Sequence, residues 1–180
     1  MAVDHKKKIK QKNSKDLVDM LDDLKAGNKL PAWPPGKAFE HIVLRAFDIE
    51  GATVIWPYSV YLEGKEIEQI DGAVYHGNIS CLIEAKDRDQ TEGIEPIAKL
   101  RNQLLRRPSG TIGLVFITSQ FSVPAKMLTR MMNPLSILLW DYDELRNAVS
   151  NKSICAALST KYMYAVELGM PDYDTRGGLR

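Results

Sequence analysis

Residues 67–86 constrain the fold more than any other segment, because they predict a β-hairpin whose register is fixed. Two strand-like segments flank the dipeptide Gly77-Asn78, and glycine at the first position of a two-residue loop favours a type II′ turn. This turn places Asp71 directly opposite Glu84, with their Cβ atoms about 5 Å apart. Lys86 lies two residues beyond Glu84 and therefore on the same face of the hairpin.

The opposite face of the hairpin supports the same register, because it is entirely apolar. A shift of one residue would mix acidic side chains into that face. We therefore expect the apolar face to pack against the core. Its members on the first strand face those on the second: Ile70, Gly72 and Val74 face Ala85, Ile83 and Cys81.

The two opposed carboxylates need compensation, since like charges directly across a sheet destabilise it. Lys86 offsets only one of the two negative charges. Paired carboxylate oxygens, with further positions left for water and phosphate, are the usual way in which Mg²⁺ is held in phosphoryl-transfer sites. The hairpin therefore predicts a metal site formed by Asp71 and Glu84. The alternative interpretation is an exposed ion-pair surface across the two strands.

The composition is that of one ordinary globular domain: 180 residues, of which 44% are hydrophobic and 26% charged. It excludes a disordered or disulfide-stapled chain. No run of about 18 apolar residues occurs, so no membrane partner is expected. The two cysteines, Cys81 and Cys155, lack CxxC spacing, which indicates reduced thiols in a cytoplasmic protein.

The segments before residue 36 predict a basic arm and a linker. Residues 1–13 are polar, lysine-rich and without periodicity, which is typical of a mobile arm. Ser14 is the expected N-cap of a short helix that ends near Gly27. The proline- and glycine-rich segment 30–36 forbids regular structure and indicates a linker, so the compact domain is expected to begin there.

Helical and strand-like segments alternate over the remaining residues, which predicts a mixed α/β domain with helices on both faces of its sheet. The near-continuous apolar run 111–118 is typical of a strand covered on both faces. Asp141 and Glu144 have the spacing of a capping box. We expect helices over 37–50, 95–107, 123–132, 141–149 and 153–168, and strands over 53–62, 66–75, 79–86, 111–118 and 136–140.

The pattern Asp71-x12-Glu84-Ala-Lys86 resembles the core of the PD-(D/E)xK nuclease superfamily, and its Mrr-like, type IV restriction endonuclease variant in particular. Flanking residues resemble it too, namely Gly36 to Glu40, Gln69 to Gly72, and Thr118-Ser119. The resemblance implies a restriction-endonuclease-like three-layer α/β/α domain over residues 36–150, with a central mixed sheet of about five strands. Residues 1–35 would precede it as the basic arm, short helix and linker, and residues 151–180 would follow as a C-terminal helix and tail.

The resemblance also assigns roles. It implies that Asp71 and Glu84 bind Mg²⁺ or Mn²⁺, that Lys86 assists the attacking water, and that Glu40 completes the site. A glutamine on the helix after the lysine strand belongs to the pattern, and Gln103 is the candidate. Ile70 stands where the superfamily has a proline.

Two basic clusters are candidates for contact with a nucleic-acid backbone, which lysine and arginine bind without regard to sequence. The alternative in each case is a solvated surface. One cluster lies on the helix after the hairpin and comprises Lys99, Arg101, Arg106 and Arg107; the other lies in the N-terminal segment and includes Lys6, Lys7 and Lys8.

The leading hypothesis is a metal-dependent endonuclease that hydrolyses phosphodiester bonds, most directly in DNA, in restriction and defence or in repair. One alternative is a catalytically inactive nuclease-fold subunit for DNA binding or assembly, against which the three signature residues argue. The other is an enzyme like a Holliday-junction resolvase. Cleavage of both strands of a duplex needs two sites, so a homodimer is a possible assembly. Mrr-like enzymes usually carry a separate DNA-recognition domain, and residues 1–35 are too few to form one, which leaves a recognition subunit as a further possible partner.

Overall fold

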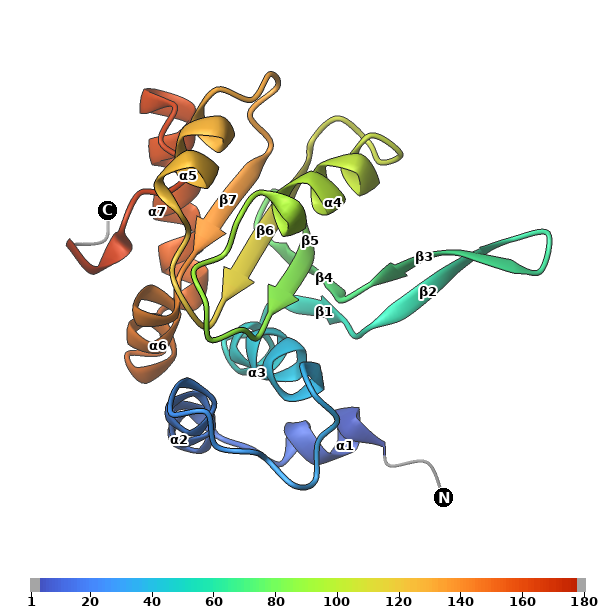
Figure 1. The fold of residues 1–180 in the computed structure, drawn as a ribbon, viewed down its shortest axis with the longest axis vertical. Coiled ribbons are helices and arrows are strands. Elements are labelled where there is room, and N and C mark those ends of the chain that lie inside the picture. The colour runs from blue at the N-terminus through green and yellow to red at the C-terminus, as the bar shows by residue number, and fades with distance from the viewer. Residues whose placement is uncertain (1–3, 178–180) are drawn as a thin grey trace.

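The structure is a computed structural model that describes residues 4–177. A five-stranded mixed sheet forms its central layer, with the strand order β1-β4-β5-β6-β7 (Figure 1). The first pairs, β1 with β4 and β4 with β5, are antiparallel, and β5, β6 and β7 run parallel. The strands are β1 (Thr53–Ile55), β4 (Gly72–His76), β5 (Ile79–Lys86), β6 (Thr111–Ile117) and β7 (Ile137–Trp140).

Helices cover both faces of this sheet, and each face has its own apolar cluster. The helices α3 (Lys37–Ile49), α6 (Tyr142–Ser150) and α7 (Ile154–Leu168) contribute to the larger cluster. The helices α4 (Glu95–Leu104) and α5 (Val123–Arg130) cover the other face. The predicted three-layer restriction-endonuclease-like fold with a mixed sheet of about five strands is therefore confirmed.

The predicted hairpin register is confirmed from Gly72 to His76, since Val74 pairs with Cys81 and Gly72 pairs with Ile83 across β4 and β5. The predicted pair of Ile70 with Ala85 is wrong, because Ile70 pairs with Tyr58. The apolar run of β6 also lies inside the sheet, as expected, between β5 and β7. Its side chains alternate between the two clusters: Leu114 and Phe116 belong to one, and Val115 to the other.

The prediction of one strand over residues 66–75 is wrong, because the chain breaks at Asp71. Residues before the break form β3 (Lys65–Ile70), which pairs with β2 (Tyr58–Leu62) in a separate two-stranded ribbon. This ribbon projects away from the central sheet (Figure 1). At the break, a Cβ on Gly72 would lie 2.5 Å from the Leu44 side chain and 3.0 Å from the Ile55 carbonyl oxygen. Glycine therefore lets α3 and β1 approach the start of β4 closely.

The break at Asp71 also changes the surroundings of Ile70. Ile70 packs with Ala73 and Leu82 in the smaller cluster, not with Val74 on the predicted apolar face. The face that carries Glu84 is therefore covered by the smaller cluster, as expected for a sheet with helices on both faces.

The N-terminal segment is not a mobile arm over its described residues. Asp4 caps α1 (His5–Lys10) by accepting a hydrogen bond from the Lys7 amide at 3.1 Å, and Ile9 is completely buried in the larger cluster. Asn13, rather than Ser14, caps α2 (Ser14–Lys25). The expectation failed because a single apolar residue, Ile9, anchors this helix, and one residue gives no periodicity.

Residues before 36 and after 150 share the larger core with the segment 36–150, through side chains of α1, α2 and α7. The segment 30–36 has no helix or strand, in line with its prolines. Both cysteines are free and buried, and burial raises the pKa of each thiol to about 12. Among residues 4–177, no helix is long and apolar enough to span a membrane.

Candidate active site

Two carboxylates meet where the β3–β4 break faces the end of β5. Asp71 lies at the break and is 5% exposed, and its Oδ2 accepts a hydrogen bond of 3.0 Å from the Ala85 amide. Glu84, one residue before Ala85, is fully buried. The hydrogen bond therefore fixes the Asp71 carboxylate beside the strand that carries Glu84.

Two lysine ammonium groups compensate the buried charge of Glu84. Lys86 Nζ lies 2.7 Å from Glu84 Oε1, and Lys99 Nζ lies 2.6 Å from Glu84 Oε2. Lys99 donates a hydrogen bond to Oε2, and Lys86 is held at Oε1 as a close ion pair. An unpaired buried carboxylate would be strongly unfavourable. Here the ammonium groups of two partly exposed lysines neutralise it.

Glu40 belongs to the same electrostatic cluster. It lies in the first turn of α3, is 8% exposed, and accepts hydrogen bonds from Lys37 Nζ at 2.8 and 3.0 Å. Burial raises the pKa of Glu40, with Asp71 adding to the rise, while Lys37 and Lys86 oppose it. Burial alone would lower the pKa of Lys86, but Glu84, Asp71 and Glu40 outweigh burial and raise it. The fold thus brings together Asp71, Glu84 and Lys86, and it places Glu40 within electrostatic range of Asp71 and Lys86.

Gln103 lies on the α4 face that packs on the sheet, one turn after Lys99, and is 5% exposed. Its Nε2 donates a hydrogen bond of 3.1 Å to the Gln69 carbonyl oxygen, and its buried Oε1 has no hydrogen-bond partner among the described residues. Gln69 precedes Asp71 by two residues. Gln103 therefore holds the strand that leads into the site, and its described contact is with that strand.

The basic residues of α4 and the following turn are largely paired with acids. Arg106 and Arg107 both bind Glu68, with 2.5 Å between Arg107 Nη2 and Glu68 Oε2. Arg101 makes a long hydrogen bond of 3.4 Å to the Asn133 carbonyl oxygen. Together with the Lys99–Glu84 pair, these contacts leave the helix far less positive than its sequence suggests.

The N-terminal lysines lie on α1 and contact aromatic rings. Lys8 Nζ lies 4.9 Å from the centre of the Trp33 ring, and Lys6 Nζ lies 5.9 Å from that of Trp56. Lys7 pairs with Asp4 at 3.5 Å. These are weak surface contacts, so they leave the lysines accessible to a ligand.

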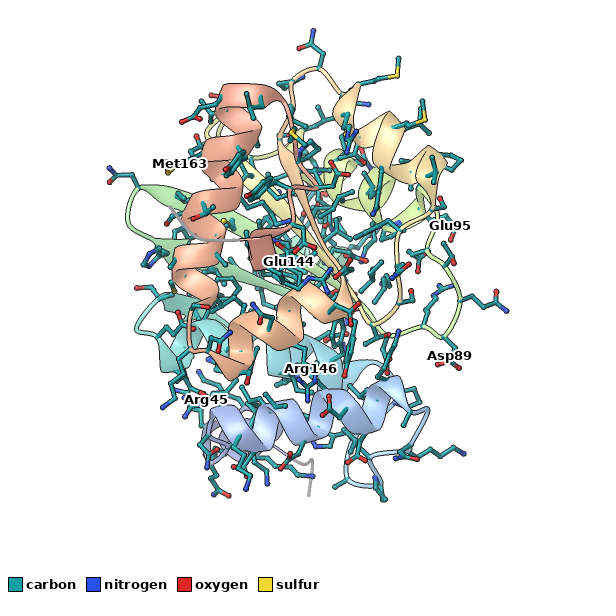
Figure 2. The ribbon with its side chains drawn as sticks, turned by 90° about the vertical axis from the view of Figure 1, so that its left-hand side faces the viewer. Arg45, Asp89, Glu95, Glu144, Arg146 and Met163 are labelled. Carbon is teal, nitrogen blue, oxygen red and sulfur yellow. The ribbon has the colours of Figure 1, made fainter. Side chains whose placement is uncertain are left out.

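Sequence reasoning missed Arg88 and Lys37. Arg88 follows the end of β5 and lines a hollow of about 180 Å³ together with Lys86, Lys99 and Glu95. In Figure 2, Glu95 and Asp89 mark the outer edge of the segment that borders this hollow. Lys37 precedes Glu40 by three residues, and this helical spacing was the signal that could have revealed the pair.

The donor set suits a hard divalent cation. It offers the carboxylates of Asp71 and Glu84, and both Glu84 oxygens face lysine side chains that are partly exposed. Within residues 4–177, no three His, Cys, Asp or Glu side chains converge as a ligand cluster. Mg²⁺ is commonly held by one or two carboxylates, with water and substrate phosphate completing its octahedron. The residues present therefore fit Mg²⁺ or Mn²⁺ in that mode.

Fold and site together define a restriction-endonuclease-like α/β domain. Residues 34–149 match the model of the restriction endonuclease family of Mrr-type catalytic domains, and the chain belongs to this family. The resemblance seen in the sequence is thereby confirmed. No curated protein matches the chain.

Several solved structures resemble this one, two of which are the following. The crystal structure of AF1548, a protein of unknown function, has a TM-score of 0.50 and 17% identity, and the match covers 73% of this chain and 77% of that one. It shares the fold. The MspJI restriction endonuclease, in complex with a 27-mer oligonucleotide, has a TM-score of 0.45 and 19% identity, and the match covers 88% of this chain. This chain spans 38% of the MspJI chain.

Proposed function

We propose that this protein is a metal-dependent endonuclease that hydrolyses phosphodiester bonds, with DNA as its substrate. The observation that carries the proposal is the fully buried Glu84 carboxylate beside Asp71, with Lys86 2.7 Å from one of its oxygens. A purely structural site would gain little from placing two acids together and compensating them with partly exposed lysines. Membership of the restriction endonuclease family supports the same conclusion.

Asp71 and Glu84 would hold Mg²⁺ or Mn²⁺. When bound, such a cation polarises a phosphoryl oxygen and lowers the pKa of water. Lys86 would orient the attacking water and stabilise negative charge that develops on the phosphate. Glu40, within electrostatic range of both Asp71 and Lys86, would keep the lysine aimed at the site. Gln103 would act through Gln69, by holding the strand that ends at Asp71.

DNA would approach across the rim formed by Lys86, Arg88 and Lys99, whose side chains are 30%, 59% and 42% exposed. Arg101 and the α1 lysines Lys6, Lys7 and Lys8 would add sequence-independent phosphate contacts. Arg106 and Arg107 would add phosphate contacts only if their ion pairs with Glu68 break. A homodimer would supply two sites for duplex cleavage, and a separate recognition subunit would supply sequence selectivity.

The test is nicking of a supercoiled plasmid in Mg²⁺, with the wild type compared with Asp71→Asn. Asparagine keeps an oxygen that can accept the Ala85 amide, so the fold is expected to survive. We expect nicking by the wild type, none in EDTA, and loss of nicking in the variant. Undiminished nicking by Asp71→Asn would refute the assignment.

A wild type that binds DNA without cutting it in Mg²⁺ or Mn²⁺ would instead support the inactive nuclease-fold subunit. Preferential cleavage of four-way junctions over linear duplex would support the resolvase-like alternative.

A further inference from the structure

Lys99 occupies a position that a purely DNA-binding lysine would not need. Its ammonium lies 2.6 Å from Glu84 Oε2, inside the proposed metal site, although α4 starts nine residues after β5 ends. Its side chain is 42% exposed, so the charged end could reach water without this contact. The ammonium therefore lies at Glu84 because of the carboxylate, not because it is trapped.

Close packing of α4 on β6 fixes the position of this helix relative to the Glu84 carboxylate. Gly113 in β6 allows the closest approach: a Cβ there would lie 2.6 Å from Leu100 Cδ2 and 3.1 Å from Leu104 Cδ1. Leu100 directly follows Lys99, and Gln103 ties the next turn to Gln69. The backbone under Lys99 is thus fixed, while its long side chain retains freedom at the rim.

The charges near Glu84 nearly cancel without a metal ion. Asp71 and Glu84 contribute two negative charges, and Lys86 and Lys99 contribute two positive ones. A divalent cation held by the same carboxylates would add two positive charges next to these ammonium groups. Because both Glu84 oxygens already face an ammonium group, a divalent cation on this carboxylate would repel both lysines and favour the withdrawal of one.

Lys99 is the lysine that can withdraw more easily. Lys86 interacts with Glu84, Asp71 and Glu40 and is 30% exposed. The described acidic partner of Lys99 is Glu84 alone, and Lys99 borders the hollow of about 180 Å³ at the rim. The hollow, which Glu92 and Glu95 also line, gives its ammonium somewhere to go.

We propose that Lys99 is an exchangeable counter-ion: it neutralises Glu84 in the metal-free protein, and it moves to a phosphate oxygen of the DNA once a divalent cation replaces it. This inference rests on the proposed nuclease function and deepens it. Lys99 is a positioning residue in the first state and a substrate contact in the second. It makes metal binding and DNA binding mutually favourable, because the cation releases the lysine that the phosphate needs.

Calorimetric titration with MgCl₂, in the absence of DNA, tests the first half. Lys99→Met removes the competing charge, so we expect it to bind Mg²⁺ about tenfold more tightly than the wild type. Lys99→Gln, which keeps a hydrogen-bond donor without the charge, is expected to do the same. Lys126→Met on α5 makes the same charge change away from the site, and its Mg²⁺ affinity should equal that of the wild type.

The salt dependence of DNA binding tests the second half, measured with Ca²⁺ in place of Mg²⁺. Loss of one phosphate contact in Lys99→Met should reduce the slope of log K against log salt by about one. Lys126→Met should leave the slope unchanged.

The outcomes separate the two proposals. Unchanged or weaker Mg²⁺ affinity in both Lys99 variants would overturn the counter-ion role while leaving the nuclease assignment intact. An unchanged salt slope would overturn the transfer to phosphate. A wild type that binds no Mg²⁺ at all would contradict the proposed function itself, and the counter-ion role with it.

Discussion

Glu144 and Glu84 are both buried and both face lysines, but their surroundings differ. Glu144 of α6 pairs with Lys161 of α7 at 2.8 Å, and both side chains are almost completely buried. Figure 2 shows Glu144 directed from α6 into the interior. Its Oε1 also accepts hydrogen bonds from the amide and hydroxyl of Thr175, and Lys161 donates to the Leu139 carbonyl oxygen. Glu84, in contrast, faces two lysines that are partly exposed.

This contrast separates a structural ion pair from a candidate active site. Around Glu144, both oxygens and the ammonium are bound by groups of the interior, so no ligand position is left. Around Glu84, each oxygen faces the ammonium group of a lysine whose side chain is partly exposed, 30% for Lys86 and 42% for Lys99. Burial of a charge therefore does not mark a site; the freedom of its partners to move does.

The largest loss of nicking activity is expected from Glu84→Gln. We predict that plasmid nicking falls by about 10³-fold or more, because one of two carboxylate ligands is lost. The free energy of unfolding in urea should change by less than about 1 kcal/mol, since Lys86 and Lys99 can both turn to water. Nicking within tenfold of the wild type would contradict the assignment of Glu84.

Lys161→Met should show the reverse pattern. Removing one partner of a buried pair leaves an uncompensated charge, which costs about 3–5 kcal/mol of unfolding free energy. Nicking per folded molecule should match the wild type. The double variant Glu144→Leu, Lys161→Met removes both charges and is expected to be more stable than Lys161→Met alone. A loss below about 1 kcal/mol in Lys161→Met would show that this pair is not structural.

Glu40→Gln is expected to have an intermediate effect, a fall in nicking of about 10- to 100-fold, which is typical of residues that orient metal ligands. The reason is that Glu40 acts on Asp71 and Lys86 from α3. Asp48→Asn, on the same helix but paired with Arg45, is the matched control and should cut normally. Equal rates in the two variants would remove Glu40 from the site.

The smallest effect is expected from Asp22→Asn, because the Asp22 carboxylate is partly exposed. Figure 2 shows Arg146 between α6 and α2, and hydrogen bonds from Arg146 and Tyr142 lower the pKa of Asp22 to about 2. Because this pKa is below its value of 3.8 in the unfolded chain, the link stabilises the fold above about pH 4 and is lost as the pH falls towards 2. Asp22→Asn should lose less stability over that pH range in acid titration of unfolding; an identical acid loss would contradict the link.

Local signals predicted the centre of the candidate site. The Gly77-Asn78 turn and alternating residues set the β4–β5 register up to the pair of Gly72 with Ile83, next to Asp71 and Glu84. The break at Asp71 could not be foreseen, because it depends on α3 and β1 approaching Gly72. The β2–β3 ribbon follows from that break.

The ion pairs in and around the candidate site depend on contacts between segments that are distant in the sequence. The pair of Lys99 with Glu84 depends on α4 packing over Gly113, and the pairs of Arg106 and Arg107 with Glu68 span more than 35 residues. Glu144 shows the same limit: the sequence predicted a capping box, and Asp141 does accept the Glu144 amide. The Glu144 carboxylate instead turns to Lys161 and Thr175, which approach only in the folded core.

The central claim is that Asp71 and Glu84 hold a divalent cation. Anomalous scattering from crystals of the wild-type protein soaked in Mn²⁺ tests it most directly. We predict one strong peak between the two carboxylates, with the Lys99 ammonium displaced from Glu84 Oε2. Crystals that show no peak there, with Lys99 still bound to Glu84, would contradict the account.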